Sequence, residues 1–202
     1  VNPNGVAWLR DLADNYPKRE LTASTAGARV LAELWTQRKP APPGQEVEQP
    51  PLPDLPPLRV IRHEQTLAMA HGRCLQLLAT PTPRWPGGLL AFEQSMGLLM
   101  SDKFFSAHLC TEDWAEANRT STEEERRHFY DCLMAPMARQ VDALVERLEE
   151  LEIRTIAPGH GPAIEVSWRS LLSDYRRWGE RHQQASLTVV LLFASAYGNT
   201  AA

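Results

Sequence analysis

The residues that most clearly could bind a ligand stand at the end of the chain, where an apolar run leads into a hydroxyl-bearing turn. The run Leu187–Phe193 is almost wholly apolar, which is typical of a strand buried on both faces. The turn that follows comprises Ser195, Ala196, Tyr197, Gly198, Asn199 and Thr200. Backbone N–H groups and hydroxyls gathered in such a turn are donors that bind a phosphate group. The sequence therefore predicts a phosphate-binding loop over 195–200.

A histidine between two glycines is the second candidate, in the Pro-Gly-His-Gly-Pro loop at 158–162. Because Ile153–Ala157 is a predicted strand, His160 would stand just beyond a strand end. Imidazole is a common metal ligand, but one imidazole holds no metal usefully, so a hydrogen-bonded loop residue is the simpler interpretation. The other histidines have no mutual spacing that indicates a site and are interpreted as surface or structural residues: His63, His71, His108, His128 and His182.

Helical periodicity and capping signals predict the helices that would position these residues. Ser24 is the expected N-cap of one helix, and Ser121–Glu124 has the pattern of a capping box for another. The predicted helices are 5–15, 24–37, a helix that carries Arg126–Leu133, a helix with Pro136 in its first turn, and 167–185. Apolar stripes expected to face the core are Val141, Leu144, Val145, Leu148 and Leu151 on the fourth helix, and Trp168, Leu171, Leu172, Tyr175 and Trp178 on the last.

Short apolar runs alternate with turns between Arg59 and Phe105, which predicts antiparallel strands of a layered α/β fold. Glu93–Gly97 is expected to close one hairpin. Residues 39–57 are dense in proline, which removes backbone donors, so an extended surface loop is predicted there. Its PPLPDLPP segment could bind a proline-recognising domain, although an insertion in an exposed loop is the simpler interpretation.

Composition places the chain among ordinary globular proteins, with 43% hydrophobic residues, 23% charged residues and a net charge of -4. A nucleic-acid partner is not expected, because the sequence has no basic stripe. No apolar run is long enough to span a bilayer, so no transmembrane segment is predicted. The widely spaced Cys74, Cys110 and Cys132 are interpreted as buried thiols in a reducing compartment, and the predicted location is the cytoplasm.

Three segments taken in order resemble one family: TPRWPGG at 82–88, FYDCLMAPMARQV at 129–141 and APGHGP at 157–162. With the strand and turn of 187–202 behind them, they are similar to flavodiiron proteins, and most to the cyanobacterial A-type, or diflavin, members. The resemblance implies a four-layer α/β (α+β) fold, in which 1–186 form a partial metallo-β-lactamase-like sandwich whose N-terminal part precedes Val1. It implies that 187–202 begin a flavodoxin-like domain, in which 195–200 would hold the phosphate of FMN.

The family pattern of metal ligands is altered in this sequence. Metal-binding members hold two irons through a His-x-Glu-x-Asp-His motif, a His before Trp-Pro, an Asp at a strand end and the His of Gly-His-Gly-Pro. The Glu-Pro-Asp-His part corresponds to residues 2–5, where Asn2 and Asn4 replace the two carboxylates and Gly5 replaces the imidazole. The resemblance therefore implies the loss of the anionic oxygen ligands that an iron centre requires.

The remaining ligand positions carry two cations. Arg84 stands before Trp-Pro and Lys103 stands at the strand end. Of the ligand positions present in this sequence, only that of His160 still carries a residue that can bind a metal. Asp102 is adjacent to Lys103 but is expected on the opposite face of the strand. Like charges near a protein surface repel by about 4 kcal/mol at 4 Å. We therefore expect Arg84 and Lys103 to converge on His160 and to exclude iron and zinc, while a solvated loop position is the alternative for Arg84.

The resemblance implies an oxidoreductase subunit that passes electrons from NAD(P)H through FMN to oxygen, with no di-iron centre in this domain. A metal-free subunit could still supply flavin to a metal-bearing flavodiiron paralogue, so a homo- or hetero-oligomer is expected, with this domain as scaffold and interface. The fragment alone is expected to be inactive. The alternative is a structural or regulatory module whose cationic pocket binds an anion. A hydrolase is disfavoured, because without a metal no activated water can form.

Overall fold

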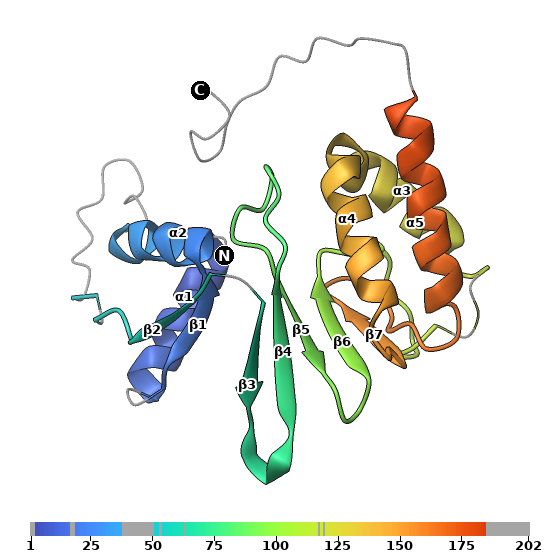
Figure 1. Ribbon diagram of the computed structural model, residues 1–202. Coiled ribbons are helices and arrows are strands. Elements are labelled where there is room, and N and C mark those ends of the chain that lie inside the picture. Colours follow the sequence, from blue (N-terminus) through green and yellow to red (C-terminus); the bar gives the residue numbers. More distant parts are fainter. Residues whose placement is uncertain are drawn as a thin grey trace, which may run out of the picture.

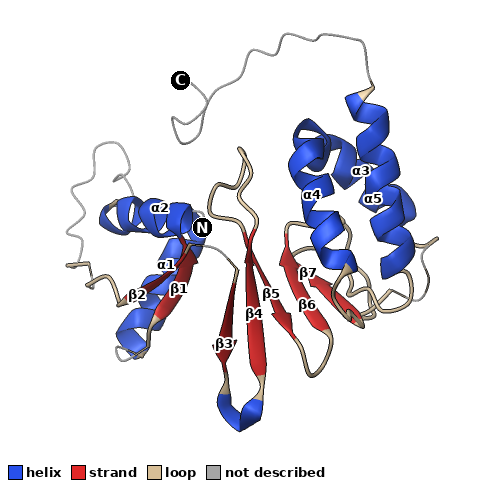
Figure 2. Cartoon of the chain, viewed as in Figure 1, coloured by secondary structure: helices blue, strands red, loops and turns tan. Residues whose placement is uncertain are grey.

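The computed structural model describes residues 3–16, 19–37, 51, 52, 54–62, 64–116, 118 and 120–184. An N-terminal group of two helices and a two-stranded sheet lies beside a five-stranded sheet, which carries a set of helices at its other end (Figures 1 and 2). The predicted phosphate-binding loop and most of the proline-rich segment lie outside the described residues. Within the described residues, no helix has the length and apolar character needed to cross a membrane.

The N-terminal group has a small core of its own, formed by Val6, Leu31, Leu34 and Trp35. Its elements are α1 (Pro3–Asn15), β1 (Leu21–Ser24), α2 (Thr25–Thr36) and β2 (Leu58–Ile61), and the two strands are parallel. Ser24 caps α2 as predicted, since its hydroxyl oxygen accepts a hydrogen bond from the Gly27 N–H at 3.2 Å. Arg10 of α1 donates to the carbonyls of Leu34 and Gln37, so it satisfies the C-terminal end of α2.

The larger sheet has the strand order β3-β4-β5-β6-β7. Its strands are β3 (Gln65–Ala68), β4 (Cys74–Ala79), β5 (Leu89–Glu93), β6 (Leu98–Asp102) and β7 (Thr155–Pro158). Strands β3 to β6 are antiparallel neighbours, which confirms the prediction for β4, β5 and β6, and Glu93–Gly97 closes the β5–β6 hairpin as expected. The apolar run that forms β2 was also expected to be antiparallel, which is wrong, because β2 pairs parallel with β1 in the separate two-stranded sheet. There the Glu93 carboxylate accepts hydrogen bonds from the Ser95 hydroxyl and the Met96 N–H. Strand β7 instead runs parallel to β6, because the intervening helices return the chain to the same edge.

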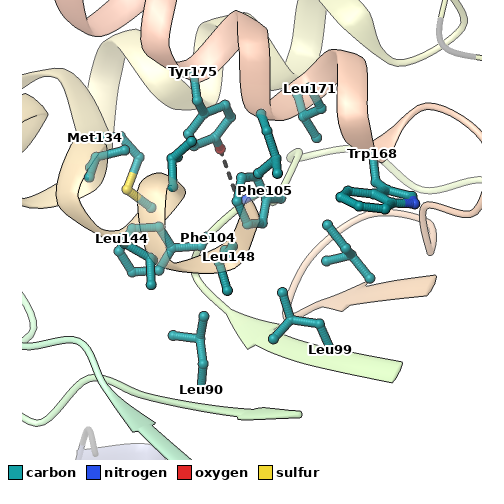
Figure 3. Packing of buried hydrophobic residues seen from close by; sticks show 14 of the residues in the cluster. Leu90, Leu99, Phe104, Phe105, Met134, Leu144, Leu148, Trp168, Leu171 and Tyr175 are labelled. Atoms are coloured by element: carbon teal, nitrogen blue, oxygen red, sulfur yellow. Dashed lines mark hydrogen bonds between the residues drawn. The ribbon is translucent and has the colours of Figure 1, made fainter. Parts of the chain in front are cut away.

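One face of this sheet packs against helices and the other is only partly covered. Leu78, Leu90, Phe92, Leu99 and Ile156 belong to the main core cluster. Because side chains alternate along a strand, the neighbouring residues point to the opposite face, where Met100 is 38% exposed. Figure 3 shows how the core is joined to the segment after β6: the Phe105 N–H donates to the Tyr175 hydroxyl at 3.0 Å.

The helices that cover the sheet are α3 (Glu123–Phe129), α4 (Ala138–Glu149) and α5 (Trp168–Gln183). A π-helical turn (Tyr130–Met134) and a 3-10 turn (Ala135–Met137) connect α3 with α4. Pro136 was predicted in the first turn of a helix, and it lies in the 3-10 turn that directly precedes α4. The predicted stripe of α4 is buried at Val141, Leu144, Val145 and Leu148, with Leu151 packed beside the core. All five predicted core residues of α5 are buried.

Two predictions about local chemistry are wrong. The capping box at Ser121–Glu124 does not form, because Thr122 occupies the N-cap and its hydroxyl donates to the buried carboxylate of Glu116. Cys110 and Cys132 are exposed, and only Cys74 is partly buried, so the three cysteines are not core thiols. The first error arises because the Glu116 carboxylate takes the hydroxyl that a capping box would use, and the second because the exposure of a cysteine depends on tertiary packing, which spacing does not encode.

Candidate functional site

The site around His160 is built where β6 and β7 end side by side. A β-bulge interrupts their pairing between Met100 and Asp102, and Asp102 has a left-handed backbone with φ of 48°. The Gly159 N–H donates to the Asp102 carbonyl, and a Cβ on Gly159 would lie 2.7 Å from that oxygen. This close approach explains why glycine precedes His160. The two strand ends therefore hold the loop of His160 against the segment that begins at Asp102.

Lys103 is the cation that this geometry delivers to His160. Its Nζ lies 3.0 Å from His160 Nε2 and 3.6 Å from Asp102 Oδ1. The ammonium therefore bridges an imidazole nitrogen and a carboxylate oxygen, and it has only donors to offer, so Nε2 must accept. Burial, followed by the charges of Lys103 and His108, lowers the pKa of the His160 imidazole. His160 is thus held neutral at pH 7, with the Nε2 lone pair directed at Lys103.

Two further residues, His108 and Asp102, complete the cluster. The His108 ring lies 5.3 Å from the His160 ring in an edge-on arrangement and also packs on Phe129 at 4.8 Å. His108 is exposed, which agrees with its interpretation as a surface or structural residue, but its position beside His160 was not predicted. The expected position of Asp102 on the opposite face is wrong, because the bulge and its positive φ bring the carboxylate to Lys103. No spacing rule predicts such a bulge.

Arg84 does not share this position. It is exposed in the turn before β5, and its guanidinium carbon lies 5.5 Å from the centroid of the Trp85 ring. The turn itself is fixed by a hydrogen bond from the Trp85 N–H to the Thr82 hydroxyl oxygen at 3.0 Å. Among the residues described, no hydrogen bond or ion pair joins Arg84 to His160. The structure therefore brings Lys103, and not Arg84, to the imidazole.

The remaining candidate residues cannot be placed in the site. Asn2 lies outside the described residues, and Asn4 falls in α1, where its side chain is not described. The predicted FMN-phosphate residues Ser195, Ala196, Tyr197, Gly198, Asn199 and Thr200 also lie outside the described residues. Their assignment stays a prediction.

A buried ion pair that the sequence did not indicate holds together the two segments that form the site. Arg126 Nη2 lies 3.2 Å from Glu116 Oε2, and both side chains are almost fully buried. The guanidinium also donates to the backbone carbonyls of Phe105 and Pro162, while the Ser167 hydroxyl donates to Glu116. Burial lowers the pKa of Arg126, but its charge is matched by Glu116. Arg126 therefore ties the segment that carries Lys103 and His108 to the loop of His160.

The donor set can be compared with what a metal ion needs. Within the part of the chain that the structure describes, no group of three or more His, Cys, Asp and Glu side chains could hold a metal. His160 offers one imidazole, and Lys103 already occupies its Nε2. Metal binding requires a free lone pair on neutral imidazole or an anionic oxygen, and a fixed ammonium opposes a divalent cation. Around His160 the described side chains of Lys103 and Asp102 are therefore joined to the imidazole and to each other by a hydrogen bond and an ion pair.

Comparisons with known proteins agree on one family. The whole chain is 36% identical to diflavin flavoprotein A 4 of Synechocystis and 36% identical to diflavin flavoprotein A 6 of Nostoc, of which it covers 31% and 32%. The flavodiiron core of Flv1 from Synechocystis superposes on all of the chain with a TM-score of 0.84 and 33% identity, and the chain covers 46% of that structure. The chain belongs to the flavodiiron family.

The flavodiiron relatives also explain the architecture. A fragment of diflavin flavoprotein A 5 from Nostoc matches 92% of this chain with a TM-score of 0.78 at 29% identity, and the chain covers 66% of that fragment. The described elements thus have the metallo-β-lactamase-like fold of the flavodiiron core, as predicted. The chain spans about a third of the length of the curated relatives it matches. No protein-family model matches the chain.

Proposed function

We propose that the protein to which this flavodiiron chain belongs is an oxidoreductase subunit that passes electrons from NAD(P)H through flavin to oxygen. In this proposal the metallo-β-lactamase-like domain, residues 1–186, serves as a metal-free scaffold and interface. The flavin is FMN, and residues 195–200 of the flavodoxin-like start at 187–202 hold its phosphate. Family membership supports the redox chemistry, because the relatives are named as diflavin flavoproteins.

The observation that carries the metal-free role is the 3.0 Å contact between Lys103 Nζ and His160 Nε2. The di-iron centre of the family does not fit these residues, because the retained imidazole has a cation on its free nitrogen and one neighbouring carboxylate is paired with the same cation. A metal entering here would have to displace an ammonium held by two partners and then remain beside it. Residues 1–186 would therefore contribute shape and contact surface, not electron-accepting metal.

A subunit without its own metal needs a partner in order to reduce oxygen. We propose a hetero-oligomer with a metal-bearing flavodiiron paralogue, in which this protein supplies electrons from its flavin and the partner supplies the metal site. A homo-oligomer of this protein would by itself lack the oxygen-reducing centre. The cytoplasm, where NAD(P)H is available, is the compartment that this function requires.

The proposal is tested by metal analysis and oxygen uptake on the intact protein, alone and mixed with a metal-bearing paralogue. We expect no stoichiometric iron or zinc, little NAD(P)H-driven uptake alone, and uptake that rises in the mixture in proportion to this subunit. A Lys103→Met variant is the matched control for the experiment with the mixture. It removes the cation beside His160 and leaves residues 187–202 unchanged. About two irons per chain, with uptake by the protein alone, would contradict the proposal.

The alternative function, a structural or regulatory anion-binding module, gains less support from the geometry. It requires Arg84 and Lys103 to face one anion, whereas Arg84 stacks on Trp85 and Lys103 is paired with Asp102 and His160. An internal carboxylate already provides the negative charge that an anion would bring. Absence of flavin-dependent oxygen uptake both alone and in the mixture would favour this alternative.

A further inference from the structure

Two large apolar side chains on neighbouring segments are exposed and contribute nothing to the core. Trp114 is 71% exposed and Val166 is 86% exposed. Single exposed apolar residues are normal on a protein surface, but two of them on adjoining segments form a candidate contact surface. Residues 112–114 and 165–166 together are called the Trp114 surface below.

Hydrogen bonds place the two segments of the Trp114 surface side by side. The Ala163 N–H donates to the Trp114 carbonyl, and the Glu116 N–H donates to the Ala163 carbonyl, both at 2.9 Å. A parallel bridge also joins the two segments. The Ser167 hydroxyl, one residue after Val166, donates to the carboxylate of Glu116. The two apolar side chains therefore extend from one hydrogen-bonded unit.

That unit is fixed to the interior through Glu116. The Glu116 side chain is 1% exposed, and its carboxylate is paired with Arg126 at 3.2 Å. The segments that carry Trp114 and Val166 are therefore held in place before any partner binds. A surface that is ordered in advance loses less conformational entropy on association. Tryptophan is also enriched among the interface residues whose truncation costs most binding energy. Trp114 thus has the properties of an interface anchor.

The charged residues of the Trp114 surface are all acidic. Glu112 and Asp113 precede Trp114, Glu165 precedes Val166, and all three carboxylates are exposed. Among the described residues none of the three forms an ion pair, and the guanidinium of Arg169 lies over its own neighbour, the Trp168 ring, at 4.3 Å. Complementary potentials favour association. A fitting partner therefore has an apolar recess bordered by lysine or arginine side chains.

A second copy of this surface does not have that chemistry. A two-fold contact brings the same surface of each copy together, so three carboxylates would face three carboxylates. Like charges placed opposite each other oppose association. The proposed function requires a different partner, because a metal-free subunit needs a metal-bearing one in order to reduce oxygen.

We propose that the Trp114 surface binds the metal-bearing flavodiiron paralogue, at an apolar recess with a basic rim. This inference rests on the proposed function for the identity of the partner. The exposed aromatic anchor, its ordered backbone and its acidic rim are properties of the chain itself.

The test measures binding of the intact protein to the full-length metal-bearing paralogue by biolayer interferometry. Trp114→Ser should raise the Kd by about thirtyfold, the loss typical of a truncated tryptophan anchor. Trp8→Ser is the matched control, because Trp8 lies on α1 and is 64% exposed. Its Kd should equal that of the unaltered protein. No binding by the unaltered protein, or equal binding by Trp114→Ser, would overturn the inference.

Salt dependence tests the acidic rim. Binding of the unaltered protein should weaken as the salt concentration rises, because screening reduces the attraction between opposite charges. The double variant Glu112→Gln with Asp113→Asn should bind more weakly at low salt and depend less on salt. A salt dependence that the double variant leaves unchanged would contradict the role of the rim.

Hydroxyl-radical labelling of Trp114, followed by mass spectrometry, identifies what covers the surface. We expect strong labelling in the intact protein alone and suppressed labelling in the mixture with the paralogue. Suppression in the protein alone at every concentration would mean that another part of the same protein covers Trp114. Suppression that grows with the concentration of the protein alone would mean that a second copy does. Either result would overturn the inference.

The inference and the proposed function can fail separately. If oxygen uptake rises in the mixture while Trp114→Ser binds as tightly as the unaltered protein, the proposed function stands and the assignment of this surface is wrong. If the two proteins bind through Trp114 and uptake does not rise, the surface assignment stands and the role in electron transfer is wrong.

Discussion

Replacing Arg126 by methionine should destabilise the fold by about 4 kcal/mol, because it removes one half of a buried ion pair. The Arg126 and Glu116 side chains are 3% and 1% exposed, so water cannot compensate the charge that remains. Breaking such a pair costs about 3 to 5 kcal/mol. The carbonyls of Phe105 and Pro162 lose a donor as well, while the hydroxyls of Thr122 and Ser167 still donate to Glu116. These effects oppose each other and leave the middle of the range as the expected value.

Urea unfolding followed by circular dichroism measures this loss, and thermal unfolding should show a fall in Tm of about 8 to 16 °C for a chain of this size. The adjacent Arg127→Met is the control. Its pair with Asp131 is about one-third exposed on each side and should contribute only about 0.5 kcal/mol. The double variant Arg126→Met with Glu116→Met should be more stable than Arg126→Met alone, since no charge stays buried. A loss below about 1 kcal/mol, or a double variant less stable than the single, would refute this account of the network.

Three further outcomes follow from the site and the N-terminal group. Lys103→Met should raise the pKa of His160, which NMR titration measures, because the variant lacks the neighbouring ammonium. In the unaltered chain the folded-state pKa of His160 is lowered from 6.5, so the free energy of unfolding falls as the pH drops below 6.5. The variant should lose less stability over the same pH range. An unchanged titration would contradict the contact. Gly159→Ala should cost about 2 kcal/mol in urea unfolding, since its Cβ meets the Asp102 carbonyl oxygen at 2.7 Å; a cost near zero would mean that the loop can move away. Ser24→Ala should cost about 1 kcal/mol through loss of the cap, whereas Ser24→Gly should cost only a few tenths.

The elements predicted best are those whose determinants are local. The stripe Val141, Leu144, Val145 and Leu148 has helical spacing, and all four side chains are buried in α4. The Ser24 cap is likewise a contact between residues three positions apart. Strands β4, β5 and β6 were predicted for the same reason, because alternation and turn residues need no knowledge of the rest of the chain. The sequence analysis predicted neither β1 nor β3.

The parts that could not be predicted depend on pairs far apart in sequence. The parallel pairing of β6 with β7 joins segments separated by two helices, and the bulge at Asp102 exists only once that pairing forms. Arg126 reads locally as one charge on a helix, yet its partners lie at 105, 116 and 162. His108 has no spacing relation to His160, and only the meeting of two loops brings the rings together.

Arg84 and Lys103 illustrate why a substituted ligand position does not by itself fix the fate of the new charge. Both are cations at positions where the family resemblance implies metal ligands. Arg84 lies in a surface turn, where a long side chain can lie over Trp85 and remain in water. Lys103 follows a strand end that is fixed by a bulge and by the Gly159 contact, so its ammonium is held at His160 Nε2. A metal needs that same lone pair. In our proposal, one constrained ammonium is therefore enough to oppose metal binding at His160, whatever the position of the second cation.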